Sequence, residues 1–191
     1  MKHTFQVDLG GMIDILGNHL YSEEKVFIRE LIQNGVDAIQ MRKNSENIQG
    51  HIHFEIFEDD QHPQICIEDN GQGLTEDEIH QFLAKIGSSL KRNQKKIDFE
   101  RNDYIGQFGI GILSCFMVTD EIVLITQSAK GGDALEWHGK NDGTYTLKKI
   151  KQKIKTGTKV YLKAKEPSSF FEIDSLTEIV RHYGQFLPTT L

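Results

Sequence analysis

The 191-residue chain is 38% hydrophobic and 26% charged, with a net charge of −6, a composition that fits one globular domain over residues 1–191. This acidic balance argues against a dedicated nucleic-acid binder, because no excess of basic side chains is present to neutralise phosphates. No apolar run reaches the length of a membrane span, and the opening MKHTFQVDLGG contains no apolar signal-peptide core, so we expect a cytoplasmic protein.

Hydrophobic periodicity predicts the secondary structure in chain order. We expect a strand over residues 3–7, helices over 10–20 and 26–42, a hairpin of strands 51–58 and 64–68, a helix over 75–86, a helix over 112–118, strands over 121–128, 134–139, 143–150 and 158–164, and a helix over 173–186. This order predicts an α+β fold, a two-layer α/β sandwich whose mixed, mainly antiparallel sheet carries helices on one face.

The two cysteines, Cys66 and Cys115, lie in the apolar segments ICIE and ILSCFMV, so we expect reduced core residues and no disulfide. Residues 87–103 are different in character: they are polar, have no sustained period and contain several lysines and arginines. A polar stretch of this length within a compact domain is typically functional or disordered. Because its basic side chains suit a ligand that carries phosphates, we favour a mobile lid over such a ligand rather than a plain solvated loop.

The helix over residues 26–42 has an unusual polar face. At roughly 100° per residue, Glu30, Asn34 and Asp37 fall within about 60° of one another. Apolar residues such as Leu31 flank this face, so it borders the core. Taken alone, the three residues fit the solvated side of an amphipathic helix, and only the motifs that follow favour a binding site.

Glycine-containing motifs follow at three places. Asp69-Asn70-Gly71-Gln72-Gly73 comes directly after a strand and places a carboxylate beside backbone that a ligand can approach. Residues 106–111, GQFGIG, precede an apolar helix, an arrangement that suits a phosphate held by backbone N–H groups. Each pattern is weak alone. The ordered set of E-x-x-x-N-x-x-D-A, D-x-G-x-G, G-x-x-G-x-G and Thr-Gly-Thr at residues 156–158 is specific.

The segments VFIRELIQNGVDAI, EDNGQGLT, IGQFGIGILS and GTKVYL resemble the amino-terminal ATPase domain of the heat-shock protein 90 (HSP90) chaperone family. That family belongs to the GHKL superfamily, together with gyrase, histidine kinases and the mismatch-repair MutL proteins. The likeness runs nearly from end to end of the chain. It implies the nucleotide-binding Bergerat fold, with ATP or ADP and Mg²⁺ as ligands.

The residue types suit these ligands. An ionised carboxylate only accepts hydrogen bonds, so Asp69 is suited to the exocyclic amine of adenine, and the Thr158 hydroxyl can serve the same edge or a bridging water. A Cβ at position 73 should clash with the bound base. The resemblance implies a set of nucleotide-binding residues: Asn34, Asp37, Asp69, Gly71, Gly73, Leu74, Gly106, Gln107, Phe108, Gly109, Ile110, Gly111, Ile112 and Thr158.

The catalytic candidates lie on the same helix. Mg²⁺ prefers oxygen ligands and keeps several waters, so Asn34 can bind it without adding charge beside the phosphates. Glu30, one turn earlier, is then free to act as general base toward the attacking water. Arg29 is the second catalytic candidate, because it can pair with Glu30 and hold it in a resting state. Asp37 either orders groups around the phosphates or has a purely structural role.

Three positions depart from the family's pattern. Phe82 stands where the chaperones usually carry an asparagine near the phosphates, and Ser88 stands where they carry a lid lysine. The pair Ile112-Leu113 replaces an expected Phe-Tyr pair. These departures put two phosphate contacts and the shape of the pocket wall in doubt, so hydrolysis is expected to be slower than the family norm or differently regulated.

The leading hypothesis is an Mg²⁺-dependent ATPase domain of a chaperone. The resemblance implies client proteins bound through regions outside this chain, a homodimer in the full-length protein with this domain monomeric alone, and no nucleic-acid or membrane partner. Residues 3–7 are the candidate strand for exchange across the dimer. Two alternatives stay open: a nucleotide-sensing module with negligible turnover, and a DNA-repair ATPase domain of the MutL or gyrase type.

Overall fold

The computed structural model describes residues 11, 25–82 and 111–184. The predictions that fall on residues 3–7, 12–20, 83–110 and 185–186 therefore lie outside the described residues. Within them the chain forms α2 (Val26–Lys43), β1 (Ile52–Phe57), β2 (Gln64–Asp69), α3 (Glu76–Phe82), the 3₁₀ helix η3 (Gly111–Met117), β3 (Glu121–Gln127), β4 (Ala134–Lys140), β5 (Tyr145–Ile150), β6 (Gly157–Lys163), the 3₁₀ helix η4 (Ser169–Phe171) and α4 (Ile173–Gly184).

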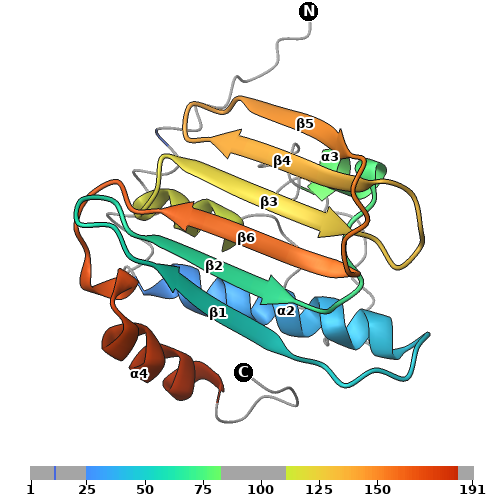
Figure 1. Cartoon of the computed structure of the whole chain (residues 1–191), viewed down its shortest axis with the longest axis horizontal. Helices are drawn as coiled ribbons and strands as arrows, with labels where there is room; N and C mark the ends of the chain where they lie inside the picture. Colours follow the sequence, from blue (N-terminus) through green and yellow to red (C-terminus); the bar gives the residue numbers. More distant parts are fainter. Residues whose placement is uncertain (1–10, 12–24, 83–110, 185–191) are drawn as a thin grey trace, which may run out of the picture.

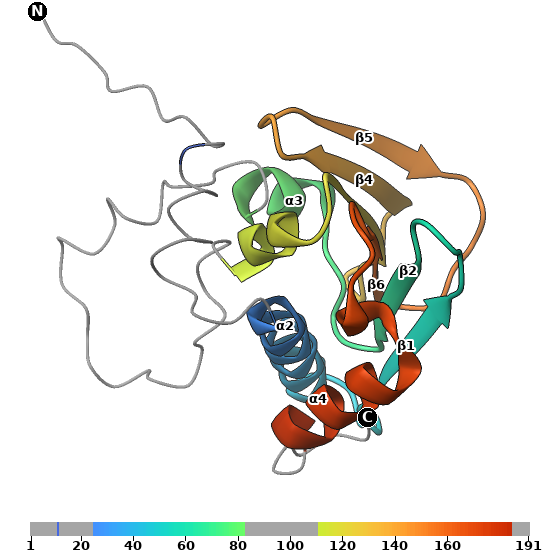
Figure 2. The same ribbon diagram turned by 90° about the vertical axis from the view of Figure 1, so that its left-hand side faces the viewer.

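The strands form one sheet in the order β1-β2-β6-β3-β4-β5, and every pair in it is antiparallel. β6, the last strand in sequence, lies between β2 and β3, so it joins the early hairpin to the later strands (Figure 1). Figure 2 shows α2, α3 and η3 on the same side of this sheet. The predicted α+β sandwich is confirmed. The helix predicted after the glycines is the 3₁₀ helix η3.

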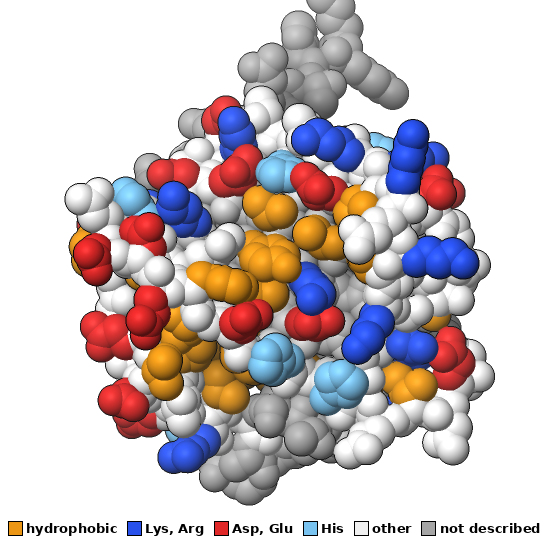
Figure 3. Space-filling model, in the orientation of Figure 1, with side chains coloured by type: hydrophobic (Ala, Val, Ile, Leu, Met, Phe, Trp, Pro, Cys, Tyr) orange, Lys and Arg blue, Asp and Glu red, His pale blue; other side chains and the backbone are white. Residues whose placement is uncertain are grey.

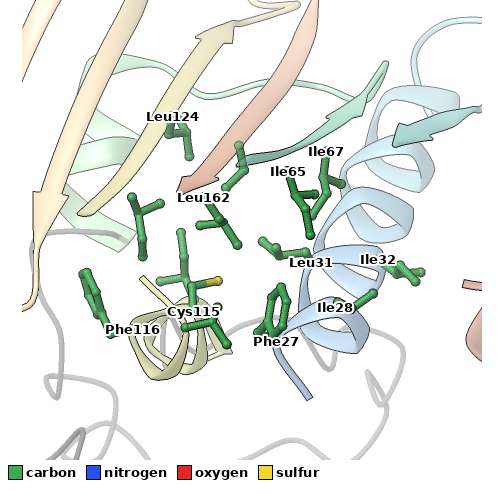
Figure 4. Close-up of a cluster of buried hydrophobic side chains, with 14 of the residues drawn as sticks. Phe27, Ile28, Leu31, Ile32, Ile65, Ile67, Cys115, Phe116, Leu124 and Leu162 are labelled. Atoms are coloured by element: carbon green, nitrogen blue, oxygen red, sulfur yellow. The ribbon is translucent and has the colours of Figure 1, made fainter. Parts of the chain in front are cut away.

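The core lies between the sheet and α2 (Figure 4). Helical spacing buries Phe27, Ile28, Leu31, Ile32 and Ile39 on one face of α2. The inward residues of the strands complete the cluster: Ile52, Ile65, Ile67, Ile122, Leu124, Val160 and Leu162. This packing fixes α2 against β1 and β2, so the polar side of the helix is held beside one end of the sheet.

The opposite face of the sheet is open (Figure 3). Its middle is apolar, where the half-buried side chains of Val123, Ile125 and Tyr161 lie on neighbouring strands. Charged side chains surround this area, including the ion pair of Lys159 and Glu68, whose Nζ and Oε2 atoms are 2.9 Å apart. Cys66 is buried on this face and Cys115 in the core; neither is in a disulfide, as expected.

Candidate nucleotide-binding site

α2 approaches β1 and β2 most closely at Gly35, which lies on the buried side of the helix. A Cβ on Gly35 would lie 2.9 Å from Cδ1 of Ile52 and 3.4 Å from Cβ of Asp69. Asn34 precedes this contact and is partly exposed. One turn of helix and the last residue of β2 are therefore neighbours, although the two motifs are well separated in sequence.

Glu30 has two different neighbours. Its Oε1 atom accepts hydrogen bonds from Nη2 and Nε of Arg29, at 2.8 and 3.2 Å. Its Oε2 atom lies 2.6 Å from where a Cβ on Gly111 would be. The carboxylate is thus paired with a cation on one side and meets the first residue of η3 on the other. This is the ion pair that the sequence suggested for Arg29.

Asp69 ends β2 and is the most electrostatically unusual residue of the site. Its Oδ1 atom accepts a hydrogen bond from the backbone N–H of Gly71, at 2.8 Å. Loss of hydration nevertheless raises the pKa of the carboxyl group to about 7, because desolvation outweighs that hydrogen bond. A half-buried acid with a strongly shifted pKa is a frequent mark of a functional site.

Thr158 lies directly opposite Asp69 in the register of β2 and β6. Its side chain is buried, and its Oγ1 atom is 3.1 Å from Oγ1 of Thr126 on β3. Thr126 also donates to the carbonyl of Gly157 at 3.1 Å and accepts the backbone N–H of Leu74 at 2.9 Å. Thr126 has one proton and two acceptors at the same distance, the Gly157 carbonyl and the Thr158 hydroxyl, so either threonine can be the donor of the bond between them.

The glycines of the second motif are required by close contacts within the fold. Gly73 has a φ of +64°, and a Cβ there would lie 2.1 Å from the carbonyl oxygen of Gln127. A Cβ on Gly71 would lie 2.5 Å from Cβ of Ala38. The sequence predicted a clash between a side chain at position 73 and a bound base, whereas here the obstacle is the backbone of the neighbouring strand β3.

The comparisons with known proteins agree with this arrangement of motifs. A family described as histidine kinase-, DNA gyrase B- and HSP90-like ATPases matches residues 21–170. The chain belongs to this family. It is an HtpG-like domain of the GHKL ATPases, since many curated relatives named chaperone protein HtpG match nearly all of the chain.

Three of these relatives illustrate the extent of the match. The protein of Bdellovibrio bacteriovorus is 32% identical over 96% of this chain and 32% of its own length. The protein of Chlorobium luteolum is 30% identical over 97% of this chain and 32% of its own length, and that of Orientia tsutsugamushi is 30% identical over 97% and 31%. The chain spans about a third of the length of these curated relatives.

Several predicted site residues of this ATPase-family domain fall beyond what the structure describes. They are Gly106, Gln107, Phe108, Gly109 and Ile110, with the lid predicted over residues 87–103 and the substituted position Ser88. Of the third motif the structure places Gly111 and Ile112. Ile112 and its neighbour Leu113 are buried in the core. Among the described residues, Glu30 lies beside Gly111, and Asp69 lies opposite Thr158.

Three positions at the site were not predicted from the sequence. Gln33 donates from Nε2 to Oδ1 of Asp37 at 2.8 Å. Thr126 links three segments of the site, and Arg42 contacts two of its turns. For Thr126 a signal existed, because it is the one polar residue at the inward positions of a strand that otherwise alternates cleanly. Gln33 and Arg42 carry no such signal.

A cavity of about 600 Å³ lies elsewhere, between the β1–β2 turn and α4. Its walls include Ile56, Asp60 and Phe171, and none of the predicted nucleotide-binding residues lines it.

No helix in the described ranges is both long and apolar enough to cross a membrane.

Proposed function

We propose that this domain binds ATP and ADP with Mg²⁺ and hydrolyses ATP to drive the conformational cycle of a molecular chaperone. The observation that carries the proposal is the meeting of Asp69 and Thr158 in register at one end of the sheet, with α2 packed beside Asp69 at Gly35. This end of the sheet then offers acceptors to a base, and the adjoining helix offers oxygen atoms to phosphates and metal.

Asp69 and Thr158 would recognise the adenine edge. The Asp69 carboxylate accepts a hydrogen bond from the exocyclic amine, and the Thr158 hydroxyl bonds to the base or to a bridging water. Such a hydrogen bond also favours the ionised form of Asp69, whose pKa is about 7 in the unliganded domain. Binding of adenine is therefore coupled to loss of a proton near neutral pH.

The donor set on α2 fits Mg²⁺. The Asn34 side chain has no hydrogen-bond partner among the described residues, so its amide oxygen is available as a ligand. Glu30 is paired with Arg29, and Asp37 accepts from Gln33. The described residues contain no cluster of three metal-binding side chains. Asn34 would therefore hold the ion together with phosphate oxygens and waters, as Mg²⁺ prefers, and the ion supplies charge neutralisation to the phosphates.

Glu30 would act as general base toward the attacking water. The Arg29 guanidinium, 2.8 Å from its Oε1 atom, holds the carboxylate in one orientation and must release it before it accepts a proton. The same ion pair is the observation that favours the second candidate function, a nucleotide-sensing module with negligible turnover. The two candidates share the binding site and differ in whether Glu30 becomes free.

The wider role follows from the chaperone relatives. Residues 1–191 would fold as a single domain. In a longer protein, client binding and stable dimerisation would reside in regions beyond this chain. Two ATP-bound copies of this domain would then pair transiently in the cytoplasm. No nucleic-acid or membrane partner is part of the proposal. The net charge of −6 disfavours the DNA-repair alternative, because a DNA-binding surface requires a basic excess.

Calorimetric titration tests the binding site first. ADP and a non-hydrolysable ATP analogue are titrated, with and without Mg²⁺, into the wild type and into the Asp69→Asn and Asn34→Ala variants. We expect Asp69→Asn to abolish measurable binding and Asn34→Ala to remove mainly the dependence on Mg²⁺. Absence of binding by the folded wild-type domain contradicts the proposal.

Steady-state turnover then separates the two candidate functions. The wild type is compared with Glu30→Ala under conditions that saturate ATP. A measurable rate that is lost in Glu30→Ala, with ATP affinity retained, supports hydrolysis. Tight binding with no turnover in the wild type supports the sensing module.

A further inference from the structure

The guanidinium of Arg42, in the last turn of α2, bridges two turns of the chain. Its Nη1 atom donates to the carbonyl oxygen of Asn70 at 3.0 Å and to that of Thr156 at 3.5 Å. Its Nε and Nη2 atoms donate to Oε2 of Glu46, at 3.0 and 2.8 Å. Only 17% of the Arg42 side chain is exposed. One side chain therefore connects α2 to the end of β2 and to the start of β6.

The two carbonyl groups flank the residues proposed to recognise adenine. Asn70 follows Asp69 directly, and Thr156 precedes Thr158 by two residues. The turns touch each other as well: Gly157 has a φ of +138°, and a Cβ there would lie 2.0 Å from the carbonyl oxygen of Asp69. Movement of either turn would therefore move both Asp69 and Thr158.

The turn after Asp69 is anchored from its other side by Asn70. The Asn70 Nδ2 atom donates to the carbonyl of Gln49 at 2.8 Å, and its Oδ1 atom accepts the backbone N–H of His51 at 2.9 Å. These bonds tie the turn to the segment that enters β1. The turn is connected to α2 by the backbone N–H of Gln72, which donates to the Ala38 carbonyl at 2.9 Å, and by the bonds of Arg42. The C-terminal half of α2 lies behind the point where β2 ends and β6 begins (Figure 1).

We propose that Arg42 is a positioning residue for Asp69 and Thr158, the two residues proposed to bind the base. It sets the position of Asp69 and Thr158 relative to α2, the helix that carries the phosphate and metal groups, and Glu46 orients the guanidinium. The planar fork of five donors reaches both carbonyls and the carboxylate at once, which a lysine ammonium does not. This inference rests on the proposed function, because it assigns Arg42 a part in adenine selectivity.

The test compares two nucleotides that differ by one group. Calorimetry measures the affinity of the domain for ADP and for purine riboside 5′-diphosphate, which lacks the 6-amino group that Asp69 would accept. The wild type is expected to favour ADP by roughly 10- to 100-fold, the range for a hydrogen bond to a charged group. In Arg42→Ala this preference falls by about fivefold or more, and Glu46→Gln shows a smaller fall.

Two further variants separate positioning from folding. Lys149→Ala, which removes an exposed ion pair with Glu76 (3.1 Å between Nζ and Oε2), should leave the preference unchanged. Partial recovery of the preference in Arg42→Lys over Arg42→Ala also supports the inference, since a lysine can still donate to one carbonyl.

The outcomes that overturn it are distinct. If Arg42→Ala melts at a lower temperature but keeps the full preference for ADP, Arg42 has only a structural role and the proposed function stands. If the folded wild-type domain binds neither nucleotide, the proposed function fails and this inference fails with it.

Discussion

Gly111 lies so close to Glu30 that a Cβ on the glycine would be 2.6 Å from the Oε2 atom of the carboxylate. This contact joins the end of the G-x-x-G-x-G motif to the polar face of α2. The obstructed atom is the far end of a flexible side chain, so a methyl group at position 111 displaces the carboxylate more easily than it disturbs the fold.

Gly111→Ala should therefore lower turnover with little effect on stability. We expect kcat for ATP to fall at least about tenfold, because a well-placed general base contributes roughly 10²- to 10⁴-fold. The melting temperature and the affinity for ADP should change little. Glu30→Gln is the matched control, since it removes the base without adding bulk. Normal turnover in Gly111→Ala would contradict the placement of Glu30 in the reaction.

Gly73 and Gly132 form a matched pair for a stability measurement. Both have a positive φ, +64° and +91°, but a Cβ on Gly73 meets the Gln127 carbonyl at 2.1 Å, whereas one on Gly132 meets nothing within 4 Å. Gly132→Ala should cost about 1–3 kcal/mol in backbone strain alone. Gly73→Ala should cost clearly more, above about 3 kcal/mol, because β3 must also move. Urea unfolding of both variants measures the difference, and equal losses would refute it.

Thr126 is buried and its hydroxyl contacts the Leu74 N–H, the Gly157 carbonyl and the Thr158 hydroxyl. Thr126→Val keeps the shape and removes all three bonds, which should lower the free energy of unfolding by about 1–3 kcal/mol. It also removes the hydrogen bond between the two threonine hydroxyls that orients Thr158, so ADP binding should weaken. Thr126→Ser keeps the hydroxyl and should retain most of the affinity. Equal affinity of the valine variant and the wild type would exclude this role.

Asp69 should make the unliganded domain less stable as the pH rises. Its pKa is about 7 in the folded protein because of desolvation, against 3.8 for an unperturbed aspartate. Between these values the unfolded chain binds fewer protons than the folded one, so the stability present below pH 4 is lost as the pH rises toward 7. The loss is at most about 4 kcal/mol. Urea unfolding at pH 5 and pH 8 should show a smaller drop in the free energy of unfolding for Asp69→Asn than for the wild type.

The same titration predicts an effect of the ligand. If adenine donates to the ionised Asp69 carboxylate, ADP should bind more tightly at pH 8 than at pH 6. Titration of the phosphate groups also changes the affinity with pH. Uridine diphosphate, which has the same phosphates but lacks the adenine edge, measures that contribution. An identical pH dependence for the two nucleotides would contradict the pairing of adenine with Asp69.

Local sequence patterns predicted most of the secondary structure. Alternation in IHFEIF and QICIED gave the hairpin, and the spacing of Phe27, Leu31 and Ile39 gave the buried side of α2. Thr75 caps α3 as expected: its Oγ1 atom accepts the backbone N–H of Glu78 at 3.3 Å, and the Glu78 carboxylate accepts the N–H of Thr75 at 2.8 Å. The helix expected after the glycines is present as η3, a 3₁₀ helix.

The motifs also named residues that the structure places side by side in two pairs, Glu30 with Gly111 and Asp69 with Thr158. Glu30, Asn34, Asp69 and Thr158 were chosen because their side chains suit a base, a metal ion and a water, and each choice depended on the side-chain type and its neighbours in sequence. The roles of these residues stay predictions until the measurements above are made.

Only the tertiary structure decided how these pieces meet. The insertion of β6 between β2 and β3 places Thr158 opposite Asp69, and the packing of α2 on the sheet brings Gly35 to Asp69 and Gly111 to Glu30. Arg42 and Thr126 gained their importance from bonds between segments distant in sequence. Local propensity and periodicity depend on neighbouring residues and so can be read from the chain. Contacts of this kind depend on which surfaces the folded core forces together, so the sequence alone did not reveal them.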